Sequence, residues 1–469
     1  MWLTRIFGTR NRILWSHPLG SPTSSGIRMH QFPRSLLLSL LVSLPLATTL
    51  RAQTSEAPAA DGSRGEPRTR AQLQQKIDSL EQDQKDLKAR LDKLEQREAE
   101  DASRVTGDDG KPLAGWDGQF YIRDKSGDYQ LNLGAYTQFR WDMNHREDPP
   151  VGENQTETAF SIRRTRIFMT GRFTEEFDFH LRTNIDSQGN VSLVNAWMQW
   201  NLSEGWTIRS GEIFLALSRE DWMFGLDVLG AEYSPNDHTF GVGTSLGVQA
   251  HRQEEAHRFW LAVSNGASGG KSDITNSSTA DYAVSGRFEW MPVGKDWSVW
   301  DDLVGRPGRA HAWMLGMGGI YQAARAGTMN VPEKGALITA DMSGNGDGWQ
   351  TLVYATWRYI VPQSGPDYQN YGFLAQASWF FTQKNALYGR YDWVSPGNQP
   401  GNLENFNSLT LGLNILPFDF TNKYKLTVET SYVLDSISKT IVPTGAGLGY
   451  LPTVDGGQFL LRLQLQFGF

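Results

Sequence analysis

The sequence contains no cysteine in 469 residues, which excludes disulfides, zinc–thiolate sites and cysteine nucleophiles. It has no run of 18 apolar residues, so we expect no membrane-spanning helix. The formal net charge is only −7, so the chain as a whole has no attraction for nucleic acid. HExxH does not occur, GxSxG occurs as GTSLG at 243–247 and as GASGG at 266–270, and no pattern indicates a bound metal or cofactor. The length allows two or three soluble domains or one large barrel.

The longest apolar run, LLLSLLVSLPL at 36–46, is too short to cross a bilayer. Basic residues precede it, and the small residue Ala52 stands where cleavage is expected, which is the layout of a secretory signal peptide. We therefore expect residues 1–52 to be a signal peptide whose true start is Met29, and the mature protein to be exported. The alternative is a buried helix at the start of a domain.

A heptad pattern follows a short polar linker. Residues 53–70 are small and polar with proline and glycine, which predicts flexibility. Residues 71–103 then repeat apolar side chains at coiled-coil spacing. The seam consists of Leu73, Ile77, Leu80, Gln84, Leu87, Leu91 and Leu94. Because a lone helix of this length is marginal in water, the seam predicts partner helices, with Gln84 fixing their register and number. The alternative is a single helix that lies on the body of the protein.

From residue 116 to residue 469 the apolar period changes to 2, which predicts strands. We expect sixteen of them, at 129–142, 158–173, 176–187, 191–202, 205–215, 238–250, 257–265, 281–291, 310–323, 336–342, 349–360, 369–382, 385–395, 406–416, 423–436 and 456–469. In the last strand the apolar side chains fall on one face and the polar ones on the other, with Leu460 the exception. Most of these strands are long enough to cross a bilayer at a tilt.

The connections alternate between tight turns, such as FTEEF and DFTNKY, and long segments, such as 216–237. Aromatic residues gather near strand ends, as in interfacial girdles. These features predict an all-β fold, a transmembrane antiparallel β-barrel of about 16 strands over 116–469, with lipid against its outer face. An even strand count places both chain ends in the periplasm, so we expect the coiled coil there.

One strand, FSIRRTRIFMTGRF at 160–173, is rich in arginine. Ile167, Met169 and Phe173 set the lipid-facing phase. Arg164, Arg166 and Arg172 are therefore expected to point inward. Arginine at mid-depth on the lipid face would cost about 2–4 kcal/mol. Arg163 falls in the opposite phase and is expected near the outer end, above the hydrocarbon.

Further inward candidates follow from the same alternation. They are Arg140, Arg182, Arg390, Lys425 and Arg462, and Arg219 joins them if the 216–237 segment folds into the pore. Rings of arginine select anions because guanidinium groups match carboxylate and phosphate oxygens. In the alternative, these cations pair with inward acids and only brace the wall; the candidates are Asp178, Asp186, Asp392 and Glu429. Over 115–469, 27 Lys and Arg face 37 Asp and Glu, a net charge of −10, which favours the alternative.

The arginine strand resembles the signature strand of the phosphate-selective porin family of the O and P type, in paired arginines, a third basic residue and a following glycine. VNAWMQW with TIRSGEIFLALSRED resembles the family's strand pair before its constricting loop, and NALYGRYDWVSPG and SLTLGLNILPF resemble its late strands. The resemblance covers 116–469. It implies a trimeric 16-stranded barrel, an arginine ladder for phosphate, and a terminal Phe469 that the barrel-insertion machinery reads.

The sequence therefore predicts a non-enzymatic outer-membrane porin for passive diffusion of small hydrophilic solutes, with anions such as phosphate preferred. The predicted pore-lining residues are Arg163, Arg164, Arg166, Arg172, Arg182, Arg219 and Arg390. The expected partners are outer-membrane lipid, small anions, two further copies of the chain and the insertion machinery. The alternatives are a general or differently selective porin, a barrel enzyme, which the scattered histidines oppose, and an envelope tether built on the coiled coil.

Overall fold

The computed structural model describes residues 70–116, 118–186, 188–267, 280–324, 332–418, 421–445 and 447–469. The predicted signal peptide and the predicted linker up to residue 69 lie outside these residues. The N-terminal helix and the sheet belong to two separate compact units, so each is described by itself.

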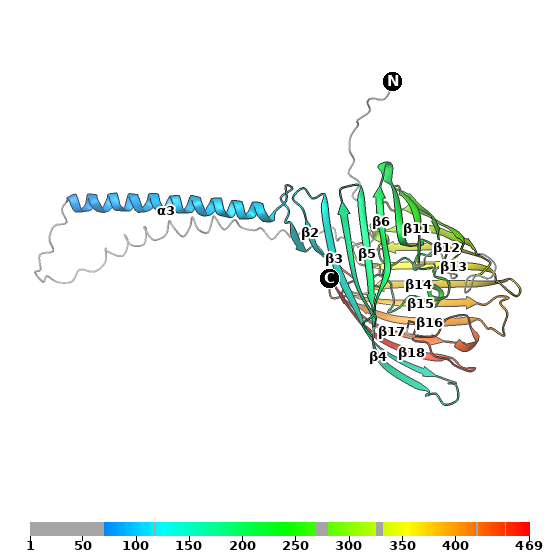
Figure 1. Ribbon diagram of the computed structural model, residues 1–469. Coiled ribbons are helices and arrows are strands. Elements are labelled where there is room, and N and C mark those ends of the chain that lie inside the picture. Colours follow the sequence, from blue (N-terminus) through cyan, green and yellow to red (C-terminus); the bar gives the residue numbers. More distant parts are fainter. Residues whose placement is uncertain are drawn as a thin grey trace, which may run out of the picture. The chain divides into compact units, whose positions relative to one another are not determined.

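Helix α3 spans Arg70–Val105, in agreement with the helix predicted over 71–103 (Figure 1). The apolar seam residues Ile77, Leu80, Leu87, Leu91 and Leu94 are exposed, and so is Gln84. Across the described part of the chain, no helix combines the length and the apolar character that a membrane span requires. The helix itself is confirmed, while its assembly into a coiled coil stays a prediction.

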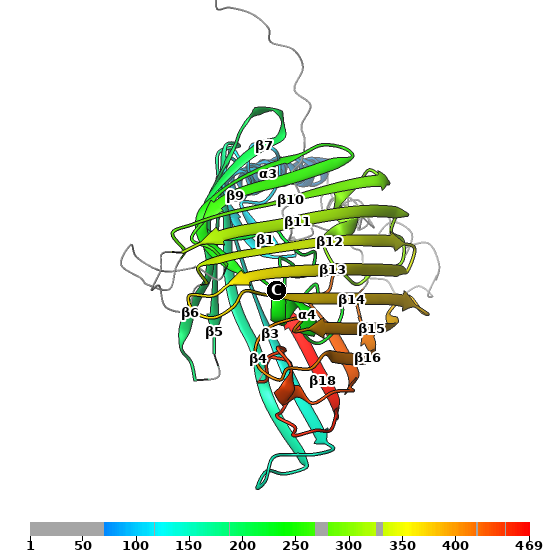
Figure 2. The same cartoon turned by 90° about the vertical axis from the view of Figure 1, so that its right-hand side faces the viewer.

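Among the described residues, sixteen strands close into one antiparallel barrel (Figures 1 and 2). They are β3 (Tyr129–Arg146), β4 (Thr156–Phe173), β5 (Phe177–Ile185), β6 (Val191–Asn201), β7 (Trp206–Phe214), β8 (Thr244–Gln253), β9 (His257–Ser264), β10 (Tyr282–Val293), β11 (Ala312–Ala323), β12 (Lys334–Gly346), β13 (Trp349–Val361), β14 (Tyr368–Phe380), β15 (Asn385–Ser395), β16 (Phe406–Ile415), β17 (Lys425–Val433) and β18 (Gln458–Gly468). Each strand pairs with the next, and β18 pairs back with β3 from Gln458 opposite Arg146 to Gly468 opposite Tyr136. The predicted barrel of about 16 strands is confirmed.

The alternation of apolar and polar side chains decides which face of each strand lies outside the barrel and which faces the lumen. In β18, Leu463, Leu465 and Phe467 are exposed on the outer face, whereas Arg462 and Gln464 are buried on the inner face. Leu460, the exception in the pattern, also turns inward and joins a buried apolar cluster. An exposed apolar outer band is the surface that lipid covers in transmembrane barrels.

The predicted start of the sixth strand, at 238, is wrong. Residues Pro235–Phe240 form a short helix, α4, and β8 begins only at Thr244. The helix is specified locally, because the Ser234 side chain accepts a hydrogen bond from the backbone N–H of Asp237 and a proline occupies the first turn. Three short 3₁₀ helices complete the helical elements of the described residues: η1 (Ser203–Gly205), η2 (Trp297–Trp300) and η3 (Ile437–Lys439).

A hairpin that the sequence pattern did not predict precedes the barrel. It consists of β1 (Ala114–Trp116) and β2 (Phe120–Arg123), and β2 pairs with β3 just beyond the point where β18 ends. The Phe120 ring lies 4.9 Å from the Trp116 ring and 5.8 Å from that of Phe469. These aromatic contacts cover the end of the seam that closes the barrel.

The connection between β7 and β8, residues 215–243, folds into the barrel, and we call it the inner segment. Leu215, Leu217 and Val228 are at most 1% exposed, although the segment has no strand partner. Its helix α4 packs against β14 and β15 and lies within the ring of strands (Figure 2). The inner segment therefore narrows the lumen. Arg219 was expected among the inward residues only if this segment folds into the pore, and it does.

Candidate functional site

A β-bulge turns two adjacent arginines into the lumen. In the pairing of β3 with β4, Gln138 faces Arg164 and Phe139 faces Ile162, so Arg163 is the extra residue. A bulge breaks the alternation of side chains. The prediction that Arg163 lies in the outward phase is therefore wrong, and both neighbouring guanidinium groups contact the inner segment.

Glu232 of the inner segment is the common partner of three arginines. Its Oε2 lies 3.0 Å from Nη2 of Arg140 and 2.5 Å from Nε of Arg163, and its Oε1 pairs with Arg164. The carboxylate is fully buried, and Nε2 of His238 is 3.6 Å from Oε1. Burial by itself would raise the pKa of Glu232, but the Arg164 and Arg163 guanidinium groups outweigh it and hold that pKa well below its usual range. Glu232 is thus an ionised counter-charge to the arginine cluster.

The backbone around Glu232 is fixed from two sides of the barrel. Arg140 Nη2 donates to the carbonyl oxygen of Ala231 (2.8 Å), and the Ala231 N–H donates to Glu429 Oε2 (3.1 Å). Arg390 Nη1 donates to the carbonyl oxygen of Glu232 (3.3 Å). These bonds hold the carboxylate in place, so its position is a built feature of the lumen.

Three other inward arginines form a row along β4, β5 and β7, and we call Arg166, Arg182 and Arg209 the arginine row. Within the described residues, none of the three makes an ion pair with a carboxylate. Arg182 stacks on the ring of Phe224 at 3.5 Å, and Arg209 stacks on the ring of Trp197 at 3.9 Å. The Nε atoms of Arg166 and Arg182 are buried without a hydrogen-bond partner among the described residues. No carboxylate of the described residues thus neutralises the row in direct contact, while Asp178 acts on Arg209 and Asp227 on Arg182 from a longer distance.

The remaining arginines of the predicted set pair within the wall or lie in the inner segment. The pairs within the wall include Arg172 with Asp178 (3.4 Å), Arg390 with Asp392 (3.1 Å) and Arg462 with Glu429 (2.8 Å). Such pairs brace the barrel, as the alternative predicted. Asp186, which was also expected in this network, instead accepts hydrogen bonds from Gln188 and Asn190 in the turn after β5.

Arg219 lies in the inner segment and is fully buried, with its guanidinium carbon 5.7 Å from the ring centre of Trp222. Its three guanidinium nitrogens have no hydrogen-bond partner among the described residues. Burial lowers the pKa of Arg219 to about 10, so it stays charged at neutral pH.

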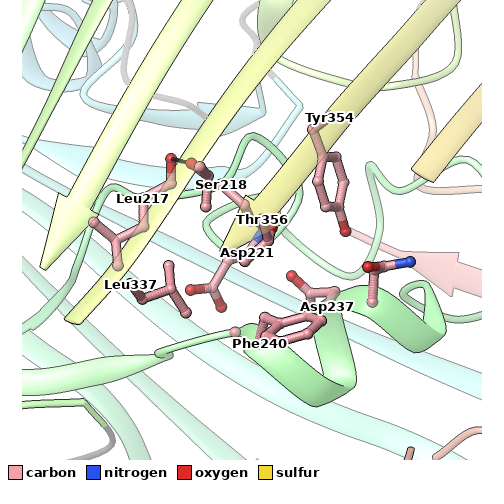
Figure 3. Close-up of a pocket in the computed structure, with 11 residues that line it drawn as sticks. Leu217, Ser218, Asp221, Asp237, Phe240, Leu337, Tyr354 and Thr356 are labelled. Carbon is pink, nitrogen blue, oxygen red and sulfur yellow. Dashed lines mark hydrogen bonds between the residues drawn. The ribbon is translucent and has the colours of Figure 1, made fainter. Parts of the chain in front are cut away.

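The inner segment is otherwise acidic, with five carboxylates and one arginine in residues 215–243. Asp221 and Asp237 line a pocket between the segment and the wall, beside Tyr354 (Figure 3). Burial raises the pKa of Asp221 to about 6, and burial together with Asp221 raises the pKa of Asp237 well above its usual range. In the ranges that the structure covers, no cluster of at least three His, Cys, Asp or Glu side chains could hold a metal ion.

Residues 133–296 match the model of the phosphate-selective porin O and P family. The match contains the arginine strand and the inner segment, and it confirms the resemblance that the motifs indicated. Together with the closed barrel, the match supports a porin of the bacterial outer membrane and points to a channel.

Two solved structures resemble the chain more distantly. OmpT, an outer membrane protein of Vibrio cholerae, is 11% identical with a TM-score of 0.48, and the alignment covers 72% of this chain and 98% of OmpT. The anion-selective porin from Comamonas acidovorans is 10% identical with a TM-score of 0.48 over 72% of this chain and all of that porin. No curated protein matches the chain.

Sequence reasoning missed two residues of this site. Arg209 was detectable, because in WTIRSGEIF it shares the inward phase of Thr207. Glu232 was not detectable, because the inner segment has no period from which its direction could be inferred.

Proposed function

We propose that this outer-membrane porin prefers small hydrophilic anions, phosphate among them, and that the arginine row lines their path. The observation that carries the proposal is the row itself. The guanidinium groups of Arg182 and Arg209 rest on aromatic rings, and among the described residues no carboxylate makes a direct ion pair with any of the three arginines. An arginine without a counter-charge attracts a mobile anion and presents a planar fork of donors to it.

The way in which the inner segment is held supports this path. Its backbone carbonyls accept hydrogen bonds from Arg287 of β10, Asn414 of β16, Lys425 of β17 and Gln466 of β18. The segment also touches the row, because its Phe224 stacks on Arg182 and leaves that side chain buried. We infer that solutes pass beside Arg166 and Arg209, which are only partly buried.

The test is the reversal potential across a planar bilayer in a KCl gradient, for wild type and for Arg166→Ala/Arg182→Ala. At roughly 6 Å in water each lost charge changes the energy of a passing ion by about 0.7 kcal/mol, or about threefold in permeability. We expect the anion-to-cation permeability ratio of the double variant to fall roughly tenfold. Arg172→Ala is the matched control, because Arg172 lies on the same strand but is paired with Asp178. An unchanged ratio in the double variant contradicts the proposal.

A differently selective porin is the second candidate, and the acidic inner segment favours it. Five carboxylates stand in the inner segment, and Glu232 offsets one of the three positive charges of the cluster of Arg140, Arg163 and Arg164. In that case the arginines serve as braces and the current is carried by cations.

We further propose that the mature chain is a homotrimer whose coiled coil at 71–103 stands in the periplasm. The exposed apolar seam of α3 supports this assembly. The outer half of β4 also supports it, because β5 pairs with β4 only from Thr165 onward and Phe160 is 71% exposed. The proposed organisation includes a signal peptide at 1–52, a linker at 53–70 and recognition of Phe469 by the insertion machinery.

A further inference from the structure

We propose that Glu232 is a specificity-determining residue, an internal anion that occupies the arginine cluster in place of a permeating oxyanion. The inference rests on the proposed function, because it concerns which anions the pore retains. It adds that this chain carries its own occupant for the site formed by Arg140, Arg163 and Arg164.

Both oxygens of the carboxylate are engaged as those of a bound oxyanion would be. Oε2 contacts Arg140 at 3.0 Å and Arg163 at 2.5 Å, while Oε1 contacts Arg164. Within the described part of the chain, every carboxylate ion pair of these three arginines goes to Glu232. Two guanidinium groups contact one oxygen of the carboxylate, and a third contacts the other oxygen. The oxygens of a phosphate ion could accept the same three contacts.

Apart from Glu232, the groups that accept hydrogen bonds from Arg140 and Arg164 are neutral. Arg164 Nη1 donates to the side-chain oxygen of Gln138 (3.1 Å), and Arg140 Nε donates to that of Gln464 (2.9 Å). Removing the charge of Glu232 therefore leaves three buried cations close together, which is a strong trap for a divalent anion. Conduction requires sites that bind weakly enough to release the ion. With Glu232 in place, the arginine row attracts anions and the cluster does not capture them.

The decisive experiment measures block of chloride current by inorganic phosphate in planar bilayers, with wild type beside Glu232→Gln. We expect the half-blocking phosphate concentration of Glu232→Gln to fall by at least tenfold, roughly the effect of one or two charge-assisted hydrogen bonds. The matched control is Glu220→Gln, in which the same residue type changes in the same segment. Glu220 pairs with Ser234 and makes no ion pair with the cluster. Its pKa is raised by burial to about 7, so the experiment is run at pH 8, where it is charged.

The outcomes separate this inference from the proposed function. If Glu232→Gln and Glu220→Gln shift the block equally, or neither shifts it, Glu232 does not determine specificity. If wild type prefers cations but Glu232→Gln alone gains block by phosphate, the proposed function fails and this inference stands. Adding Arg164→Gln to Glu232→Gln should return the block toward the wild-type concentration.

A second variant guards against loss of folding. Glu232→Asp keeps the charge but withdraws it by one methylene group, and we expect an intermediate, several-fold gain in block. Folding of each variant is checked by the heat-dependent mobility that closed barrels show on gels. A folded Glu232→Asp barrel with wild-type block overturns the inference.

Discussion

Arg163 and Arg164 are neighbours in the sequence, yet both contact Glu232. The alternation of side chains along a strand assigns them to opposite faces. This assignment is correct for Arg164, and also for Arg166 on the same strand. A single bulge between Gln138 and Phe139 of the facing strand reverses the assignment for Arg163. Bulges carry no strong sequence mark, so this detail of the site required the structure.

Asp227 of the inner segment gives a prediction on pH. Burial, and after it the nearby Asp302 carboxylate, raises the pKa of Asp227 to about 7. The pKa of an unfolded aspartate is about 3.9, so the folded state holds a proton that the unfolded state releases. Stability from this group is therefore complete below pH ~4 and is lost as the pH rises through 7. The pKa of Glu232 is lowered, so its effect on stability has the opposite pH dependence. The stability that Glu232 contributes is lost only when the pH falls into the acid range, below the range in which Asp227 titrates.

We therefore expect the thermal unfolding midpoint in detergent to fall by roughly 2–4 °C between pH 5.5 and pH 8.5. Asp227→Asn should reduce that fall without removing it, because burial also raises the pKa of Glu220 and of Asp221. A midpoint with the same pH dependence in Asp227→Asn and wild type would show that the Asp227 carboxyl is not the titrating group.

At the scale of elements, strands were predictable and the inner segment was not. The barrel wall meets lipid outside and polar groups inside, so alternation is imposed on nearly every strand and can be read from residues such as Leu463 and Gln464. The inner segment is buried among polar and apolar groups of the lumen on several sides. Nothing imposes a period on it, and α4 was therefore taken for the start of a strand.

Helix α3 gives the prediction at this scale. If its seam holds three copies together, Leu80→Ala/Leu87→Ala removes large apolar side chains from every copy, and core truncations of this kind cost about 2–5 kcal/mol each. We expect the full-length trimer in detergent to dissociate at a temperature lower by on the order of 5 °C, as followed by light scattering.

Lys88→Ala is the control for this variant, since Lys88 lies on α3 outside the seam. Equal dissociation temperatures for all three proteins would mean that α3 does not join the subunits. The alternative of a single helix resting on the protein body would then be preferred.

For the whole molecule, the architecture could be predicted from the sequence more fully than the ion selectivity of the pore. Sixteen alternating segments, most of them long enough to cross a bilayer, were enough to predict a closed barrel. The hairpin of β1 and β2, which packs on Phe469, escaped prediction because its strands are only three and four residues long. Selectivity depends on which cations remain without a partner. That depends on contacts such as that of Arg182 with Phe224, which join segments distant in the sequence.

The most direct measurement of the central claim is the reversal potential of the wild-type channel in a KCl gradient. A porin whose arginine row keeps its charge should give open channels that conduct chloride in preference to potassium. Added phosphate should then reduce the chloride current. Channels that prefer potassium, or a folded protein that forms no channels, would contradict the account.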